Sequence, residues 1–432
     1  MRKTVADRRG FLKATSATVA ASFFTGNVLG ANDRKVGAYI GTGRMGLGNI
    51  RYSARAGDIV QKYVCDVYEP NLQKAVDRTD GKAKPVRDFR EILADNEVDF
   101  VCIATPDHWH PYMEVEACKA GKDVYVEKPI SVYIEDGVSM VKAARKYKRV
   151  VQAGTMQRSG LHFQQAAEIV RSGVLGKVTF CRTWNYGNQD VSGIGNPPDS
   201  APPPDLDWDM WLGPAQKRPF NKNRFGVDPK EFSRFRYFWD YAGGMMTDWG
   251  VHLLDIVQWP FGEEMPNAIT ALGGKYFIQD NRETPDTLQV TYEYPSGMVA
   301  TYENRVGNGH SFAEGFNISF HGTKGTLYLS RRGYRVIPEH PDTNDLAGVQ
   351  VAAFNQSNVA HWRNFLHCMD TRERPISDIE KCQHTTTTCL LGNIALRSKL
   401  RLDWDAGRWT TAQDAAHPYL HSKARDPWKI VV

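Results

Sequence analysis

Short apolar runs alternate with helix-like segments between residues 36 and 153. Strands are expected at residues 36–40, 60–67, 100–104, 123–126 and 150–153, where valine, isoleucine and tyrosine are frequent. Helices are expected at residues 89–95, 111–120 and 134–147. Continuous apolar strands that alternate with helices are typical of a parallel sheet with helices on both faces. We therefore predict a doubly wound α/β domain whose ligands bind at the carboxyl ends of its strands.

A glycine-rich turn, Gly41-Thr42-Gly43-Arg44-Met45-Gly46, directly follows the first predicted strand. In such a turn, the first glycine allows a sharp exit from the strand and the second lets a pyrophosphate approach the backbone. The third lets the next helix pack closely on the strand. The amino end of that helix would present free N–H groups to the phosphates. We predict that these six residues form a dinucleotide site rather than a purely structural turn.

Asp66 lies near the end of the second predicted strand, 20 residues after Gly46. A carboxylate at this distance from the glycine-rich turn can accept hydrogen bonds from the ribose of adenosine. The residue therefore favours NAD as the cofactor over NADP.

Polar residues follow the third predicted strand in the sequence ATPDHWHP, residues 104–111. His108 and His110 form a His-x-His pair, but a metal site needs further ligands, and none stands nearby at a recognisable spacing. No metal site is therefore predicted. We expect this loop to lie over the cofactor instead.

Glu127-Lys128-Pro129 follows the fourth predicted strand. A glutamate–lysine pair at a strand end is usually a surface ion pair. This pair follows an apolar strand directly and would point into the cleft that a nicotinamide needs. Lys128 could then hydrogen-bond a substrate hydroxyl or carbonyl oxygen and polarise it, while the proline restricts the backbone.

A third motif, GGMMTDWGVHLLD, occupies residues 243–255. Its glycines suit a loop that enters a helix, and Asp248 and His252 stand four residues apart, which places both on one helical face. Histidine titrates near neutral pH and is a natural base for the proton of a sugar hydroxyl. In the alternative interpretation, Asp248 caps the helix and His252 is a buried structural histidine.

Four further residues are candidate ligands. Gln157 and Arg158 follow the fifth predicted strand and could contact cofactor or substrate. Trp184 and Tyr186 follow a predicted strand at residues 177–182, and aromatic side chains beside amides suit sugar rings. An aromatic edge of the core explains the last two equally well.

Residues 196–211 are rich in proline and acidic residues, which predicts a loop near the pocket or a subunit interface.

The sequence DRRGFLK at residues 7–13 resembles the start of a twin-arginine export signal. A mildly apolar stretch at residues 14–29 follows, and it is too short and too polar to span a bilayer comfortably. We predict that residues 1–31 are a signal peptide that engages the twin-arginine export machinery and directs the folded protein to the periplasm. An ordinary amphipathic start or a short membrane anchor is the alternative.

That segment accounts for most of the net charge. Residues 1–31 hold five basic residues and one acidic residue, a net of +4, whereas the whole chain carries +5. The remaining residues are therefore close to neutral and contain no basic run, so no nucleic-acid partner is expected. The seven cysteines form no CxxC motif, which argues against a disulfide framework and a zinc cluster.

Together, GTGRMG, VCDVYEPN, ATPDHWHP, VEKP and GGMMTDWGVHLLD resemble in order and spacing the motifs of the Gfo/Idh/MocA oxidoreductases. The resemblance covers most of the chain and is strongest over residues 35–155 and 240–256. It implies an NAD-binding Rossmann domain at residues 32–155. It also implies, at residues 156–432, an α/β domain with a large, mostly antiparallel sheet. That sheet often forms an oligomer interface in the family, so a homo-oligomer, either a dimer or a tetramer, is expected.

The resemblance also implies roles for single residues. Lys128 would orient and polarise the reacting C–O group, His252 would exchange the hydroxyl proton, and Asp248 would position His252. The adenosine and pyrophosphate would be held by Gly41, Gly43, Gly46 and Asp66. The nicotinamide half of the site would be lined by Thr105, Pro106, His108 and Glu127.

Three classes of function remain open. The first is an exported oxidoreductase of sugars, sugar derivatives or polyols, which would retain its NAD because the periplasm offers no free pool. The second is a redox-neutral glycosidase or lyase that works through a transient 3-keto sugar. The third is a non-catalytic sugar sensor, which the presence of all three catalytic candidates disfavours. The ordinary DWGVH sequence leads us to favour the first class.

Overall fold

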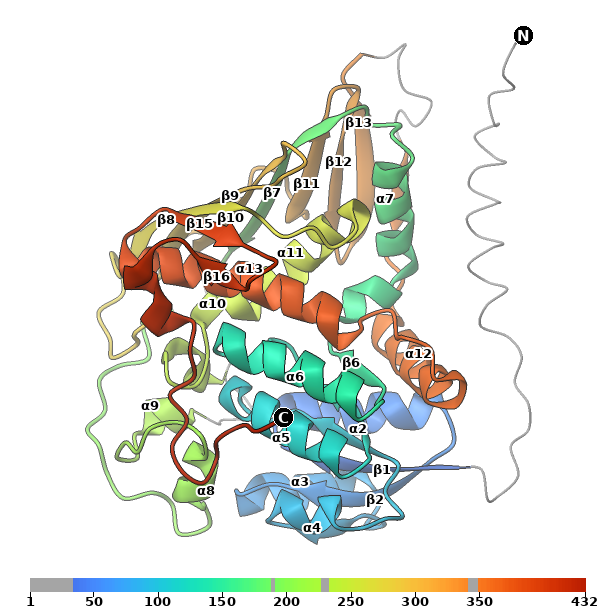
Figure 1. Ribbon diagram of the computed structural model, residues 1–432, viewed down its shortest axis with the longest axis vertical. Helices are drawn as coiled ribbons and strands as arrows, with labels where there is room; N and C mark the ends of the chain where they lie inside the picture. Colours follow the sequence, from blue (N-terminus) through green and yellow to red (C-terminus); the bar gives the residue numbers. More distant parts are fainter. Residues whose placement is uncertain (1–33, 188–190, 227–232, 341–348) are drawn as a thin grey trace.

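The computed structural model describes residues 34–187, 191–226, 233–340 and 349–432. The predicted export signal, residues 1–31, lies outside these ranges. Within them the chain builds two sheets, a smaller one in the lower half of Figure 1 and a larger one in the upper half.

The smaller sheet has six parallel strands in the order β3-β2-β1-β4-β5-β6. The strands are β1 (Lys35–Ile40), β2 (Ile59–Cys65), β3 (Lys84–Val86), β4 (Phe100–Ile103), β5 (Asp123–Val126) and β6 (Val151–Ala153). The helices between them are α2 (Arg44–Ala56), α3 (Glu69–Arg78), α4 (Phe89–Leu93), α5 (His110–Lys119) and α6 (Ile134–Lys146). The predicted doubly wound parallel sheet is confirmed.

The sequence analysis missed one strand and one helix of this domain, and several predicted boundaries differ from the observed ones by one or two residues. Strand β2 ends at Cys65, two residues before the predicted end, so Asp66 lies just beyond the strand. The unpredicted strand β3 has only three residues, including a proline, at the sheet edge. The unpredicted helix α3 is largely polar, EPNLQKAVDR, and buries only three residues. Both elements therefore carry a weak hydrophobic pattern.

The larger sheet has ten strands in the order β14-β13-β12-β11-β7-β10-β9-β8-β15-β16. They are β7 (Val178–Tyr186), β8 (Ala268–Gly274), β9 (Thr287–Glu293), β10 (Val299–Arg305), β11 (Ile318–Gly322), β12 (Gly325–Ser330), β13 (Gly333–Pro338), β14 (Gln350–Ala352), β15 (Leu402–Asp405) and β16 (Thr410–Thr411). Strands β7 and β10 run parallel, and the other pairs are antiparallel. The predicted large, mostly antiparallel sheet is confirmed.

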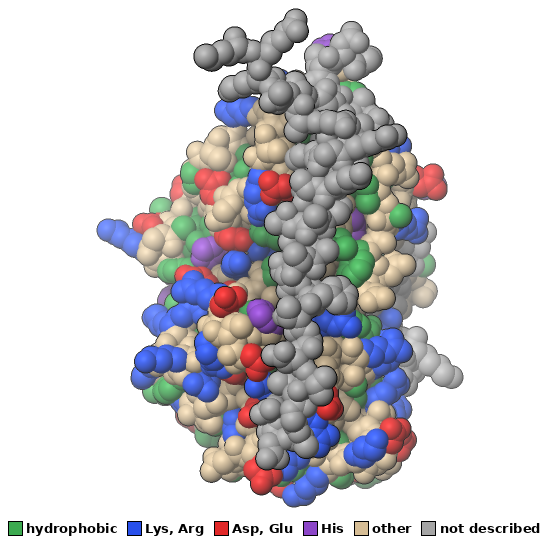
Figure 2. All heavy atoms as spheres, turned by 90° about the vertical axis from the view of Figure 1, so that its right-hand side faces the viewer, with side chains coloured by type: hydrophobic (Ala, Val, Ile, Leu, Met, Phe, Trp, Pro, Cys, Tyr) green, Lys and Arg blue, Asp and Glu red, His purple; other side chains and the backbone are tan. Residues whose placement is uncertain are grey.

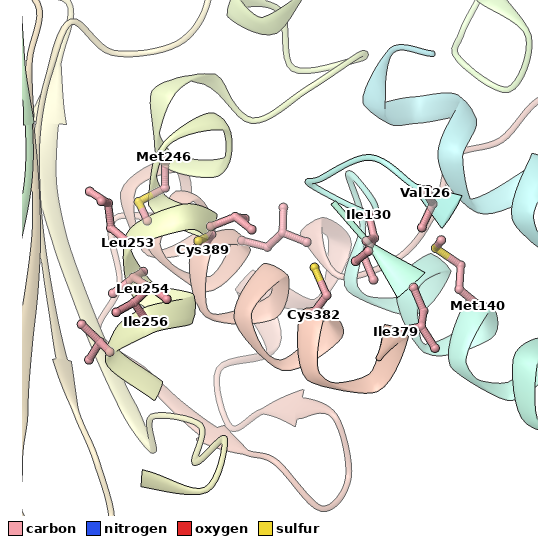
Figure 3. Close-up of a cluster of buried hydrophobic side chains, with 14 of the residues drawn as sticks. Val126, Ile130, Met140, Met246, Leu253, Leu254, Ile256, Ile379, Cys382 and Cys389 are labelled. Atoms are coloured by element: carbon pink, nitrogen blue, oxygen red, sulfur yellow. The ribbon is translucent and has the colours of Figure 1, made fainter. Parts of the chain in front are cut away.

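Helix α13 (Ile379–Ser398) joins the two sheets through one continuous core. It lies between α6 and the large sheet in Figure 1 and contacts α6, α11 (Gly250–Gln258) and strand β8. Figure 3 shows Cys389 beside side chains of α11 and Cys382 on the side toward Ile130 and Val126. The helices α7 (Leu161–Arg171), α10 (Gly244–Asp248) and α11 cover the same side of the large sheet. This shared core fixes the residues after β5 relative to those of α10 and α11.

Helix α12 (Ser357–Thr371) belongs to the second half of the sequence but packs on the parallel sheet. Its Trp362 stacks on Tyr125 of β5, with ring centroids 4.2 Å apart and planes 10° apart. The Trp362 Nε1–H also donates to Oδ1 of Asn49 on α2. The face of the sheet that carries α2 and α3 is therefore completed by a segment more than 200 residues distant in sequence.

The surface has mixed charge. On the face in Figure 2, acidic side chains lie among the many lysine and arginine side chains of the lower half. All seven cysteines lie within the described residues as buried thiols. In the part of the chain that the structure describes, no helix combines the length and apolar character needed to cross a membrane.

Candidate active site

A cleft of about 740 Å³ opens at the carboxyl ends of the parallel strands. One wall comes from the loops after β1, β2, β4 and β5, and the opposite wall from α10, α11, the turn between β12 and β13, and the short helix α8 (Trp208–Leu212). The lining includes these predicted site residues: Gly41, Gly43, Arg44, Met45, Asp66, Thr105, Pro106, Glu127, Lys128, Asp248 and His252. Residues from five separated motifs therefore share one cavity.

The three glycines of the turn have the three environments that dinucleotide binding requires. Gly41 has a φ of +82°, a conformation that L side chains rarely adopt. A Cβ at Gly46 would lie 2.0 Å from the carbonyl oxygen of Gly41, so the close approach of α2 to the turn needs this glycine. A Cβ at Gly43 would meet no protein atom within 4 Å. The backbone at Gly43 is thus open to the cleft, and the cradle fits a dinucleotide pyrophosphate.

These environments predict different results for two alanine variants. We expect Gly43→Ala to change the stability of the cofactor-free protein by less than about 0.5 kcal/mol, because its methyl group meets no protein atom. We expect the same variant to bind NAD at least about tenfold more weakly, a loss of roughly 1.4 kcal/mol. Gly46→Ala should destabilise the protein itself. Thermal unfolding without nucleotide and NAD titration separate the two effects, and unchanged NAD affinity in Gly43→Ala would contradict the assignment.

Asp66 closes the adenosine end of the cleft. Its Oδ2 accepts hydrogen bonds from the backbone N–H of Thr42 at 2.8 Å and from the Thr42 hydroxyl at 3.2 Å. Its Oδ1 accepts from the backbone N–H of Tyr68 at 3.0 Å. Thr42 is buried and acts through Asp66 rather than lining the cleft. The carboxylate is thereby fixed at the ends of β1 and β2, the position that suits a ribose hydroxyl.

Lys128 reaches across the cleft to the opposite wall. Its Nζ donates to the backbone carbonyl of Asp248 at 2.8 Å and to Asp248 Oδ1 at 2.9 Å. Both side chains are only 13% exposed. Because the amine is held by a carboxylate and a carbonyl, its direction is fixed while its third proton stays available to a ligand. The predicted polarising lysine therefore lies where a reacting oxygen can meet it.

Glu127 lines the cleft but is buried, and its carboxyl group is held from behind. Its Oε1 accepts a hydrogen bond from Nδ2 of Asn49 at 2.9 Å, and Asn49 in turn accepts from Trp362. A Cβ at Gly154 would lie 2.7 Å from Glu127 Oε2, so that glycine makes room for the carboxyl group. Burial raises the pKa of Glu127, and the hydrogen bond from Asn49 counteracts the rise.

Asp248 is arranged differently from the prediction. It is the last residue of α10, and His252 lies in α11, so the two residues do not share one uninterrupted helix. The Asp248 carboxylate pairs with Lys128 and, at 3.4 Å, with Arg236. Burial opposes its charge, but Arg236 and Lys128 outweigh burial and hold its pKa below the usual range. Asp248 thus orients Lys128, and no hydrogen bond joins it to His252 among the described contacts.

His252 lines the cleft as a neutral imidazole. Its ring is 6% exposed, and Nδ1 has no hydrogen-bond partner among the described residues. Burial lowers its pKa well below the usual value, and the positive charges of Lys128 and Arg331 lower it further. The backbone carbonyl of His252 accepts a hydrogen bond from Nε2 of Gln157. A neutral ring can accept a proton over the whole neutral pH range.

The histidines of the ATPDHWHP loop bind backbone carbonyls. His108 does not line the cleft, and its Nε2 lies 3.1 Å from the carbonyl of Trp211. His110 lies between the carbonyls of Pro129 at 2.7 Å and Thr105 at 2.9 Å, and so connects two cofactor-facing loops. Within the described part of the chain, no group of three or more metal-ligating side chains occurs.

Asp107, which sequence reasoning passed over, lines the cleft beside Lys128 and Arg236. Burial raises its pKa to about 8, and the charges of Arg236 and Lys128 offset only part of that rise.

A carboxyl with a raised pKa contributes stability that is present below about pH 4 and is lost as the pH rises through 8. The asparagine of Asp107→Asn cannot ionise. The melting temperature of the variant minus that of the wild type should therefore increase as the pH rises from 5 to 8.5. A constant difference across melting curves in that window would contradict this assignment.

The four predicted substrate ligands lie outside the cleft lining. Gln157 is buried and bridges His252 and Arg331, and so acts behind the wall. Arg158 is fully buried in ion pairs with Asp255 and Glu263. Trp184 and Tyr186 lie within β7 rather than after it, and each contacts Phe312. Gly46 also lies outside the lining, where it serves helix packing.

Sequence reasoning missed two cationic residues that line the cleft near Asp248. Arg236 comes from a short helix, Arg234–Tyr237, and Arg331 from the turn between β12 and β13. Arginines in a four-residue helix or a turn carry no sequence signal. The proline-rich residues 196–211, in contrast, were expected near the pocket or a subunit interface, and Met210 and Trp211 at the end of that stretch line the cleft.

Family models match nearly all of the described chain. A model described as "Oxidoreductase family, NAD-binding Rossmann fold" matches residues 36–155. A second, "Oxidoreductase family, C-terminal alpha/beta domain", matches residues 159–430. The chain therefore belongs to the Gfo/Idh/MocA oxidoreductase family, and its first domain is an NAD-binding Rossmann domain.

Two curated relatives and one solved structure illustrate the family. The chain is 27% identical over 240 residues to 2,7-anhydro-N-acetylneuraminate hydratase of Escherichia coli, and the matched region covers 55% of this chain and 53% of the relative. It is 30% identical over 154 residues to inositol 2-dehydrogenase of Salmonella typhimurium, and the matched region covers 35% of this chain and 46% of the relative. The chain thus spans about half the length of these relatives. Aldose-aldose oxidoreductase from Caulobacter crescentus, in complex with glycerol, matches with a TM-score of 0.64 at 20% identity, over 86% of this chain and 100% of that chain. The last comparison concerns the fold alone.

Proposed function

We propose that this protein is an exported NAD(H)-dependent oxidoreductase that acts on a hydroxyl or carbonyl group of a sugar, sugar derivative or polyol. One observation carries the proposal: Lys128 is held by Asp248 in the wall of a dinucleotide-sized cleft that a neutral His252 also lines. A hydrogen-bond donor for the reacting oxygen and an acceptor for its proton are the two groups that this redox chemistry requires.

Each residue of this site has a separate role in the proposed reaction. Lys128 donates an N–H to the substrate oxygen and stabilises the negative charge that develops on it. His252 takes the hydroxyl proton in the oxidation direction and returns it in the reduction direction. Asp248 and Arg236 fix the position of the lysine. Bound NAD supplies the acceptor and donor of the hydride.

The glycine-rich turn and Asp66 would hold the cofactor, with Thr105 and Pro106 lining the nicotinamide half. We further propose that residues 1–31 export the folded protein and that the cofactor stays bound through successive turnovers. The periplasm offers no free NAD, so each hydride taken from one substrate must be returned within the same site. This proposal rests on the twin-arginine motif at residues 7–13 and on a cleft of about 740 Å³ that can hold a dinucleotide.

A redox-neutral reaction is a second candidate function. It is favoured by the identity to a relative named as a hydratase, since hydration changes no net oxidation state. The same residues serve such a reaction if a sugar carbon is oxidised transiently and then reduced.

Incubation of the purified protein with sugars, polyols and glycosides tests both candidates. An oxidoreductase changes the nicotinamide absorbance near 340 nm in the presence of one substrate and forms oxidised and reduced products from a substrate pair. A redox-neutral enzyme releases or rearranges sugar with no net oxidised product. Binding of sugars without any conversion would contradict both and would support a sensor.

A further inference from the structure

Three cationic side chains line the cleft around Asp248. Lys128, Arg236 and Arg331 all line it, and their charges act on the Asp248 carboxylate. Asp248 makes direct ion pairs with two of them, Lys128 and Arg236. Asp107 and Glu127 also line the cleft, and burial raises the pKa of both carboxyl groups. Of the three cations, Arg331 is the one that makes no direct ion pair with Asp248 among the described contacts.

Arg331 differs from the other two cations, because it forms no direct ion pair with a carboxylate of the described residues. Its Nε donates to Oε1 of Gln157 at 2.9 Å, and its guanidinium lies over the ring of Trp249 at 4.9 Å from the centroid. Gln157 is itself fixed by its hydrogen bond to the carbonyl of His252. The guanidinium is therefore held at its Nε edge by Gln157 and on one face by Trp249.

Arg331 lines the cleft, and the other edge of its guanidinium has no hydrogen-bond partner among the described residues. The residue is exposed although protein surrounds much of it, and its two terminal nitrogens make no hydrogen bond to any described residue. A terminal pair of guanidinium N–H groups matches two oxygens of a carboxylate or phosphate. A purely structural arginine in such a place would be expected to pair with an acidic side chain, as Arg158 does with Asp255 and Glu263.

We propose that the substrate carries an oxyanion, a carboxylate or a phosphate, and that the terminal N–H groups of Arg331 bind it. This inference rests on the proposed function, because it names the substrate class for the same site. Arg331 stands on the wall that also carries Asp248 and His252. It would hold the charged end of the substrate while Lys128 and His252 act on a hydroxyl group elsewhere on the same molecule.

A matched ligand series tests the inference. The probes are D-glucose, D-glucuronate, D-gluconate and D-glucose 6-phosphate, with the corresponding galactose series. For each, the ligand-induced rise in melting temperature and the kcat/KM for reduction of bound NAD are measured. We expect an anionic member to exceed its neutral parent by roughly 10- to 100-fold in affinity or in kcat/KM, the effect of one charge-assisted hydrogen-bonded pair. Preference for the acids or for the sugar phosphates identifies the oxyanion.

Arg331→Gln and Arg332→Gln form the matched pair of variants. Arg332 is the adjacent exposed arginine on the same turn and does not line the cleft. Arg331→Gln should abolish the preference for the anionic member, whereas Arg332→Gln should keep it. Arg331→Lys should keep part of it, because lysine retains the charge and loses the planar pair of donors.

The outcomes separate this inference from the proposed function. Reduction of NAD by neutral and anionic sugars with equal efficiency would overturn the inference and leave the proposed function standing. A thermal preference for the anionic ligands that Arg331→Gln removes, without any conversion, would support the inference and count against the proposed function. Equal binding of all ligands by the wild type, or an unchanged preference in Arg331→Gln, would also overturn the inference.

Discussion

Replacing Lys128 with methionine is expected to lower kcat by about 100- to 1000-fold, the usual effect of removing a donor that stabilises charge in a transition state. Methionine keeps much of the lysine stem and removes the charge and the hydrogen bonds to Asp248. The Asp248 carboxylate keeps its contact with Arg236 at 3.4 Å, so we expect the protein to fold. NAD binding should change little, because the glycine-rich turn and Asp66 lie at the other end of the cleft. Steady-state kinetics and NAD titration of the variant provide the measurement.

Lys122→Met is the control for this substitution. Lys122 flanks the other end of β5, is also largely buried and donates from Nζ to the carbonyl of Asp95 at 2.6 Å. Its removal should affect stability and leave kcat unchanged, because it lies outside the cleft lining. Equal losses of kcat in the two variants would show that the loss in Lys128→Met reflects folding rather than chemistry.

The second large effect concerns Arg158, which the sequence placed among candidate ligands. The side chain is 0% exposed and forms ion pairs with Asp255, which is 1% exposed, and Glu263, which is 15% exposed. Arg158→Met would leave two acidic side chains without their cation in the core. Breaking a buried ion pair in this way costs about 3–5 kcal/mol, so the free energy of unfolding in urea should fall by that amount. The KM of whatever protein remains folded should be unchanged.

Arg171→Met is the matched control for Arg158. Both guanidinium groups lie over the ring of Trp259, at 5.2 Å for Arg158 and 5.4 Å for Arg171. Arg171 is exposed, and its ion pair with Glu168 spans 3.8 Å, so its replacement should cost less than about 1 kcal/mol. A stable Arg158→Met variant with a raised KM would restore the predicted role of Arg158 as a ligand.

The cofactor half of the site could be predicted because its signals are local in sequence. The turn from Gly41 to Gly46 follows its strand directly, and its three glycines stand within six consecutive residues. The order of apolar runs likewise specifies a parallel sheet, since continuous apolar strands need cover on both faces. The strand β3 and helix α3 were missed because a short edge strand and a polar helix leave little pattern.

The catalytic half depends on contacts that no local pattern encodes. Lys128 and Asp248 are 120 residues apart, and their contact arises because α13 packs both sheets into one core. The sequence spacing placed Asp248 and His252 on one helix, but the chain breaks that helix at Trp249. Arg236 lies in a four-residue helix and Arg331 in a turn, and neither segment is long enough to show a periodic pattern, so their place in the cleft could be seen only in the folded chain.

The most direct test of the central claim is the identity of any nucleotide that the protein retains. The mature protein is purified without added cofactor and denatured, and the released small molecules are identified by mass. The account predicts NAD or NADH at about one molecule per chain. An empty protein that binds added NAD weakly and reversibly would contradict a retained cofactor and the export proposal that depends on it.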